Sequence, residues 1–318
     1  MKKNKNAIFE ILTIFCIYFL FLNTLILAKE FKIVLKINNS IITNADIINE
    51  YNYLIALNED LDKIKREEVL DIARESIIKE NIKKIEIEKY IKIETYDRDE
   101  LINEIIKNIY TRSKFQNISE FKNYLDTFGL SLATVKDKLK IEIMWNQLIA
   151  EKYKSQITVN KEKIRDKVLK EKINYKNLTE YDLSEIVFSA KNTEELSSKE
   201  KEIKSTIESI SFETAANKFS ISDTSNFGGN IGKINENQLS KKMKNELKKI
   251  DTGEYTKAIN IGNNFMIIKV NKKNLINLKL DENEIINKMI EIERKKQYEN
   301  FSMIYYNKIK LNSIIDEL

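Results

Sequence analysis

The chain has 318 residues, with 54 Lys and Arg against 49 Asp and Glu, one Cys, six Gly, and neither His nor Pro. Without His, a Ser-His-Asp or Cys-His catalytic site and an imidazole metal ligand are excluded, and a single Cys cannot form a Cys-rich zinc site. The length allows about two domains of roughly 150 residues, and an apolar fraction of 42% is enough to form their cores. We therefore expect a folded protein that binds no cofactor and no metal.

Charged residues of both signs are interspersed along the chain and give it a net charge of +5. This pattern is typical of a solvated surface, whereas a nucleic-acid interface needs a basic patch or stripe. We therefore expect no nucleic-acid partner, and we expect the charged side chains of the helices to face water.

Residues 1–28 carry a targeting signal. Three Lys among the first five residues precede an apolar stretch from Ile11 to Ala28 that contains no charged residue, as in the n-region and h-region of a secretory signal. As a helix this stretch spans about 27 Å, slightly less than a hydrocarbon core of ~30 Å. Two alternatives are open: a cleaved signal peptide, or a retained N-terminal anchor that associates the protein with the membrane. In both, the positive N-terminal flank predicts that the remaining chain lies outside the cytoplasm.

The next elements are a predicted β-hairpin and a long helical region. Phe31–Ile37 alternates apolar and polar residues and Ser40–Thr43 reads as the return strand. Thr43 and Asp46 predict a capping box that opens a helix through about Leu57. Further helices are predicted over 62–92, from 97 onward, and over 119–129, 131–155 and 160–172. Their apolar stripes predict a helical bundle; whether the bundle leaves a groove for an extended apolar segment is open at this level.

From about residue 181 the pattern changes to mixed strands and helices. Gly228, Gly229 and Gly232 cluster here. The Gly pair indicates a flexible turn or a close backbone approach, because no Lys-Ser or Lys-Thr follows at the spacing of a phosphate loop; we expect no nucleotide. The predicted elements are a strand over 181–189, helices over 193–209, 212–219 and 240–249, a hairpin of 255–261 with 264–270, and a C-terminal helix over 281–306 and strand over 309–315.

The β-α-α-β-α-β-β order of this region resembles the parvulin (PpiC-type) family of peptidyl-prolyl isomerases. The matching segments, in the order of that family, are LSEIVF, FETAANKFS, NFGGNIG, QLSKKMKNELKKIDTGEYTKAI and NNFMIIKV. The flanking regions are similar to SurA-like periplasmic chaperones. The opening IVLKINNSIITNADII, residues 129–168 and the C-terminal helix and strand carry this second resemblance.

The two resemblances together imply an α+β fold, in which a mainly helical chaperone core is completed by the C-terminal helix and strand and carries an inserted parvulin-like domain. The implied division is a signal peptide or N-terminal anchor over 1–28, a SurA-like N-terminal helical domain over 29–176, a parvulin-like domain over 177–273, and a C-terminal helix and strand over 274–318 that pack on the N-terminal domain.

The parvulin resemblance also implies where a catalytic site would lie. The family's His in the first strand falls on Glu185, its His in the last strand falls on Met266, and its Cys or Asp ahead of the Gly pair falls on Ser222, with Asp223 adjacent. Rotation about an X–Pro bond has a barrier of ~18–20 kcal/mol and removes no proton, so the absence of His does not forbid it. Because all three positions differ, we expect weak or no isomerase activity. If Glu185 is buried opposite Met266, we expect it to lack a partner and either to have a raised pKa or to turn outward.

The apolar floor that receives the proline ring in the family is implied at four positions. Leu239 and Met243 stand where the family has Met and Phe, Phe265 matches an aromatic residue, and Met266 lies next to it. Two interpretations are open for this set: simple core packing, or a substrate-binding surface on which Met adapts to varied peptides.

The resemblance implies a periplasmic chaperone or foldase that binds unfolded outer-membrane or other exported polypeptides. Two alternatives remain. One is an active peptidyl-prolyl cis-trans isomerase, in which Ser222 or Asp223 and the apolar pocket suffice. The other is a PpiD-like chaperone that residues 1–28 anchor in the inner membrane.

Overall fold

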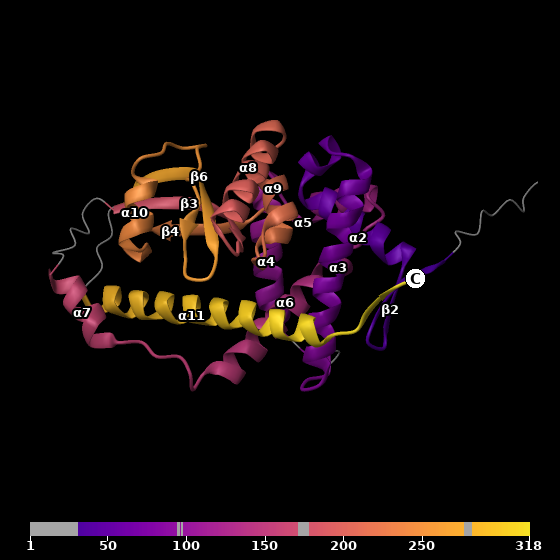
Figure 1. The fold of residues 1–318 in the computed structure, drawn as a ribbon, viewed down its shortest axis with the longest axis horizontal. Coiled ribbons are helices and arrows are strands. Elements are labelled where there is room, and N and C mark those ends of the chain that lie inside the picture. The colour runs from indigo at the N-terminus through magenta and orange to yellow at the C-terminus, as the bar shows by residue number, and fades with distance from the viewer. Residues whose placement is uncertain (1–30, 94–95, 97, 171–177, 277–281) are drawn as a thin grey trace, which may run out of the picture.

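The computed structural model describes residues 31–93, 96, 98–170, 178–276 and 282–318. Residues 31–170 and 282–318 form a helical domain, and residues 178–276 form a module around a four-stranded sheet, which lies above the long C-terminal helix in Figure 1. The predicted α+β class, with an inserted β-α-α-β-α-β-β unit, is therefore confirmed. The predicted signal or anchor over 1–28 lies outside the described residues. Among the residues that are described, no helix is both long and apolar enough to cross a membrane.

A three-stranded antiparallel sheet joins the two ends of the helical domain. It consists of β1 (Ile33–Ile37), β2 (Ser40–Thr43) and β7 (Ile315–Glu317) in the order β2-β1-β7. β7 pairs with β1, so that the last residues of the chain complete a sheet begun by the first described ones. The predicted strand over 309–315 is wrong in its position. The preceding helix continues to Asn312, because Ile309 packs with helical spacing against the core of the helical domain.

In the described residues ahead of the module, seven helical segments are assigned. Thr43 and Asp46 form the predicted capping box at the start of the first helix. The predicted helix over 62–92 begins later than expected, because Asn58 caps a separate 3₁₀ turn ahead of it. The segments are α2 (Asn44–Leu57), η1 (Glu59–Lys63), α3 (Arg66–Glu88), α4 (Asp99–Arg112), α5 (Ile118–Thr127), α6 (Leu132–Tyr153) and α7 (Lys161–Lys170).

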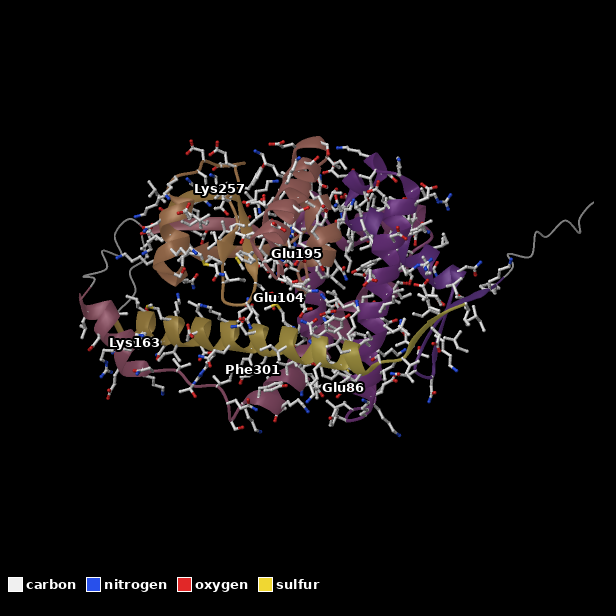
Figure 2. All side chains as sticks on the ribbon, in the orientation of Figure 1. Glu86, Glu104, Lys163, Glu195, Lys257 and Phe301 are labelled. Atoms are coloured by element: carbon white, nitrogen blue, oxygen red, sulfur yellow. The ribbon has the colours of Figure 1, made fainter. Side chains whose placement is uncertain are left out.

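The long helix α11 (Glu282–Asn312) packs across α6 and ties the end of the chain to the helical domain. The Phe301 ring stacks on Tyr153 with ring centroids 4.4 Å apart, and Tyr305 stacks on Trp145 at 5.8 Å. The indole Nε1 of Trp145 donates to Ser302 Oγ at 2.8 Å. Phe301 and Glu86 are labelled in Figure 2, where the end of α11 crosses the helical domain. Aromatic packing therefore fixes the helix that runs beneath the module.

The module is built on one antiparallel sheet with the strand order β4-β3-β6-β5. Helices α8 and α9 match the predicted ranges, because Asn192 and Ser211 supply N-caps that are readable in the sequence. The predicted strand over 255–261 shrinks to two residues, preceded by a single bridge from Tyr255 to Lys269. The elements are β3 (Leu178–Phe188), α8 (Thr193–Ser209), α9 (Phe212–Phe219), η3 (Ser225–Phe227), β4 (Asn230–Asn235), η4 (Glu236–Gln238), α10 (Lys241–Leu247), β5 (Ile259–Asn260) and β6 (Phe265–Ile276).

Candidate functional site

Glu185 lies in β3 and points into a small polar cluster. The residue is buried, with 8% of its surface exposed. Its Oε1 accepts hydrogen bonds from Ser222 Oγ at 2.8 Å and from Thr224 Oγ1 at 3.1 Å, and the two hydroxyl oxygens lie 3.1 Å apart. The expectation that a buried Glu185 lacks a partner is therefore wrong, since the structure brings Ser222 to it. The two family positions Glu185 and Ser222 form one cluster.

Burial raises the pKa of the Glu185 carboxyl to about 7. The hydrogen bonds from Ser222 and Thr224 act in the opposite direction, while the carboxylate of Glu299 on α11 adds to the upward shift and Lys295 opposes it. The raised pKa expected from the sequence for a buried carboxyl is confirmed. Near neutral pH the cluster therefore holds a carboxyl group that gains and loses a proton readily.

Replacing Glu185 with Gln is expected to make stability less dependent on pH. The folded-state pKa of about 7 lies above the ordinary value of 4.5. The folded protein therefore binds the extra proton, and this contribution is present below about pH 4.5 and lost as the pH rises through 7. Glu185→Gln keeps an acceptor oxygen for both hydroxyls and cannot ionise. It should raise the free energy of unfolding relative to wild type by up to about 3 kcal/mol at pH 8, and by much less at pH 5.

Urea unfolding at both pH values measures this difference. Glu202→Gln on the exposed face of α8 is the matched control and should shift both curves equally. An equal effect of Glu185→Gln at pH 5 and pH 8 would contradict the assignment of a near-neutral titration to Glu185.

The loop that carries Ser222 is held beside β3 by backbone geometry. The Ile221 N–H donates to the Val187 carbonyl at 2.8 Å, and the Glu185 N–H donates to the Gly229 carbonyl at 2.7 Å. Gly229 has φ +75°, and a Cβ built there would lie 2.1 Å from the carbonyl oxygen of Glu185. Of the two interpretations of the Gly pair, the close backbone approach is confirmed. Only Gly allows the loop to lie this near to the strand.

The structure brings three of the four predicted floor residues together and separates the fourth. Leu239 is buried, and Met243 and Met266 are partly buried against the same apolar cluster. Phe265 packs instead against Phe188 in the cluster on the other side of the sheet, with ring centroids 5.9 Å apart.

The sequence analysis considered the case in which Glu185 lies opposite Met266, and the structure does not pair these two residues. Met266 pairs with Val187, while Glu185 pairs with Ile268. Because side chains alternate along a strand, Met266 and Glu185 still share one face of the sheet. This face therefore carries the polar cluster and, beside it, two partly exposed Met side chains.

Asp223, the neighbour of Ser222, forms ion pairs with the helical domain. Its Oδ1 lies 2.8 Å from Lys83 Nζ and 3.0 Å from Lys79 Nζ, both on α3. Lys79 Nζ also donates to the Ser222 carbonyl at 3.0 Å. Although burial acts in the opposite direction, the two ammonium groups lower the pKa of Asp223 well below its ordinary value.

Lys83 is the residue of this cluster that the sequence analysis missed. Its side chain is 0% exposed, and its Nζ also lies 2.6 Å from Glu142 Oε2 on α6. The expectation that helix charges face water is wrong here. A signal was present, because Lys83 lies seven residues after Ser76 and four before Ile87, on the buried stripe of α3. Burial acts against the charged ammonium, but Asp223 and Glu142 more than offset it and raise the pKa of Lys83.

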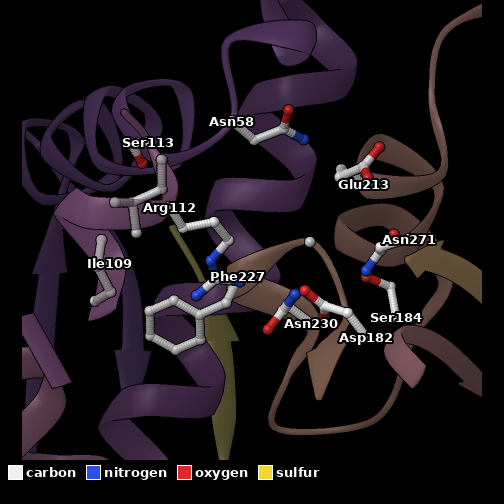
Figure 3. Close-up of a pocket in the computed structure, with 12 residues that line it drawn as sticks. Asn58, Ile109, Arg112, Ser113, Asp182, Ser184, Glu213, Phe227, Asn230 and Asn271 are labelled. Atoms are coloured by element: carbon white, nitrogen blue, oxygen red, sulfur yellow. The ribbon is translucent and has the colours of Figure 1, made fainter. Parts of the chain in front are cut away.

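A cavity of about 270 Å³ lies elsewhere between the helical domain and the module. Arg112 at the end of α4 and Phe227, Asp182 and Asn230 of the module project toward it (Figure 3). Lys83 and Asp223 do not line it. Across the described part of the chain, no group of three or more acidic or Cys side chains is arranged to hold a metal ion.

Residues 178–272 match the family model of the PPIC-type PPIase domain, described as rotamase. Among solved structures, the chain is similar to a PpiC-type peptidyl-prolyl cis-trans isomerase domain, with 23% identity, 30% of this chain and 93% of that chain covered, and a TM-score of 0.28. It is also similar to the peptidylprolyl isomerase PrsA from Bacillus anthracis (19% identity, 76% and 98% covered, TM-score 0.29). A SurA-like chaperone of Campylobacter jejuni gives 14% identity, 90% and 98% covered, and a TM-score of 0.32. The comparison with curated proteins found no match.

The fold and the matched segment define a protein with one PPIC-type domain set between two parts of a helical domain. The parvulin-type domain inferred from the sequence is confirmed over residues 178–272. The matched residues 178–272 fall inside the predicted domain 177–273, whose borders stay predictions.

Proposed function

We propose that the protein is an exported chaperone or foldase that holds unfolded outer-membrane or other exported polypeptides, and that its PPIC-type module has weak or no prolyl isomerase activity. The charge-free apolar stretch from Ile11 to Ala28 behind an N-terminal Lys cluster supports export. The PPIC-type match supports polypeptide as the ligand class. If residues 1–28 are not cleaved, they would anchor the same chaperone in the inner membrane.

The observation that carries the proposal is the composition of the site face, which is the face of the module's sheet that bears Glu185 and Met266. A carboxyl, Glu185, and two hydroxyls, of Ser222 and Thr224, form the polar cluster, and apolar Met266 takes the other family His position. An isomerase must bind the twisted X–Pro amide better than the planar one. Hydrogen bonding within the cluster uses its hydroxyl donors on Glu185 rather than on a substrate carbonyl. Partly exposed Met243 and Met266 offer an adaptable apolar contact, which suits binding more than catalysis.

The test uses the purified chain and an unfolded outer-membrane barrel protein diluted from urea, with no nucleotide present. We expect a small molar excess of the chain to suppress light scattering. In the same preparation, NMR exchange on an X–Pro peptide should show less than about a tenfold increase of the isomerisation rate, which corresponds to about 1.4 kcal/mol of barrier. Failure to suppress aggregation at stoichiometric excess would contradict the chaperone.

A fast exchange rate that falls in Leu239→Ala would favour the alternative, an active isomerase. Leu239 is the buried member of the apolar cluster beside Met243 and Met266. Its truncation should damage a catalytic proline pocket more than it damages a surface that holds unfolded chains loosely.

A further inference from the structure

One contact between the helical domain and the module is made by a short loop, residues 222–224. Lys79 and Lys83 of α3 reach this loop from one side, as described above. From α11, Ser302 Oγ donates to Asp223 Oδ2 at 3.3 Å. Ser302 is itself held by Trp145 of α6. Two helices of the helical domain, α3 and α11, therefore contact a single carboxylate of the module, and α6 holds one of its partners.

The same loop carries the hydroxyls that bind Glu185. Ser222 precedes Asp223 and Thr224 follows it, so the residue anchored to the helical domain lies between the two donors of the site cluster. Besides the larger effect of burial, the charges of Glu299 and Lys295 on α11 act in opposite directions on the pKa of Glu185. Asn264 Nδ2, in the β5–β6 turn, lies 3.9 Å from Met303 Sδ of α11. The site face is turned toward the helical domain.

A second set of contacts joins the two parts away from the site face. Asn58 Nδ2 donates to Asn217 Oδ1 at 2.7 Å, and Lys218 Nζ lies 2.8 Å from Glu68 Oε2. Phe227 packs against the core of the helical domain. These contacts do not involve Asp223. The module therefore keeps an attachment when the contacts of Asp223 are removed.

We infer that Asp223 is a latch that closes the site face of the module against α3 and α11, and that a polypeptide segment reaches the buried Glu185 only when this ion cluster opens. The inference rests on the proposed function, since it concerns how a client reaches that face. Opening costs less than the burial of Lys83 alone suggests, because Lys83 keeps Glu142 as a partner at 2.6 Å when Asp223 leaves. The contacts that a bound polypeptide makes with the exposed site face offset the remaining free-energy cost of opening the ion cluster.

The latch is tested by a cross-link across the site face. Asn264→Cys and Met303→Cys are introduced together with Cys16→Ser, so that the engineered pair carries the only thiols. A short bismaleimide should link the pair rapidly in the closed form. Adding Asp223→Ala should slow the cross-linking about tenfold, because charge-assisted hydrogen bonds hold the face closed. Asp251→Ala, in the same module and 96% exposed, is the matched control and should change the rate less than twofold.

Peptide access is measured on the same proteins without the Cys pair. A fluorescein-labelled apolar peptide with one X–Pro bond should bind Asp223→Ala about tenfold more tightly than wild type or Asp251→Ala. Circular dichroism of each variant checks that the fold is kept. Asp223→Asn is included as a milder substitution at the same position. An unchanged cross-linking rate in both Asp223 variants overturns the latch, and slower cross-linking with unchanged affinity overturns its control of access. Failure of the proposed function is distinct, because the chain would then not suppress aggregation whatever the cross-linking rate.

Discussion

Replacing Lys83 with Met is expected to lower the free energy of unfolding by about 3–5 kcal/mol, the range measured when one partner of a buried ion pair is removed. Lys83 is fully buried, and Glu142 and Asp223 both bond its ammonium group. Met fills most of the same volume, so the packing against Trp145 is largely kept. The loss would come from the carboxylates, because the mostly shielded Glu142, whose side chain is 24% exposed, loses the ammonium group that bonds it.

Denaturant unfolding of Lys83→Met beside Lys204→Met measures this effect. Lys204 and its partner Glu208 are each 60% exposed, so the control removes a surface pair and should cost less than about 1 kcal/mol. The double variant Lys83→Met with Glu142→Gln should recover part of the loss, because the stranded carboxylate is removed. Equal effects of Lys83→Met and Lys204→Met would show that the cluster adds nothing to stability.

Elements with local signals could be predicted from the sequence, and those decided by distant packing could not. The helices Thr193–Ser209 and Phe212–Phe219 were predicted with the observed bounds, because each begins at a side-chain cap. The C-terminal end of α11, in contrast, was not predicted correctly. Apolar residues after Tyr306 fit either a helix or a strand, and only contact with the helical domain selects the helix as far as Asn312.

The residues of the candidate site also fall into two groups, those that the sequence could identify and those that only distant packing brings together. Glu185 and Ser222 were found because they occupy family positions within one module. Lys83 lies 140 residues from Asp223 in sequence, and Ser302 lies 79 residues from it. No pattern within the module shows that they meet. Lys83 lies on the buried stripe of α3, but only the docking of the two parts explains why a Lys is buried there.

The geometry at Gly229 links the stability of the module to the position of its site. Gly229 and Gly232 have almost the same positive φ, +75° and +78°. A Cβ at Gly232 meets no atom within 4 Å, whereas one at Gly229 lies 2.1 Å from the Glu185 carbonyl oxygen. The two positions therefore separate the cost of the left-handed backbone from the cost of the close approach.

Gly229→Ala is expected to destabilise the protein by about 3 kcal/mol or more, and Gly232→Ala by only about 1–2 kcal/mol. The smaller cost is that of placing a Cβ in a left-handed conformation. Gly229→Ala adds an overlap with the backbone that is relieved only by separating the loop from β3, which breaks the 2.7 Å bond from the Glu185 N–H to the Gly229 carbonyl.

Thermal and urea unfolding of the two variants measure the difference. The moving segment also carries Ser222 and Thr224, whose hydrogen bonds oppose the effect of burial on the pKa of Glu185. Gly229→Ala should therefore also shift the titration of Glu185 upward from about pH 7, while Gly232→Ala leaves it in place. Equal destabilisation by the two variants would mean that the loop at Gly229 can move away from β3 with no further loss of stability. The close approach at Gly229 would then not be what holds the site together.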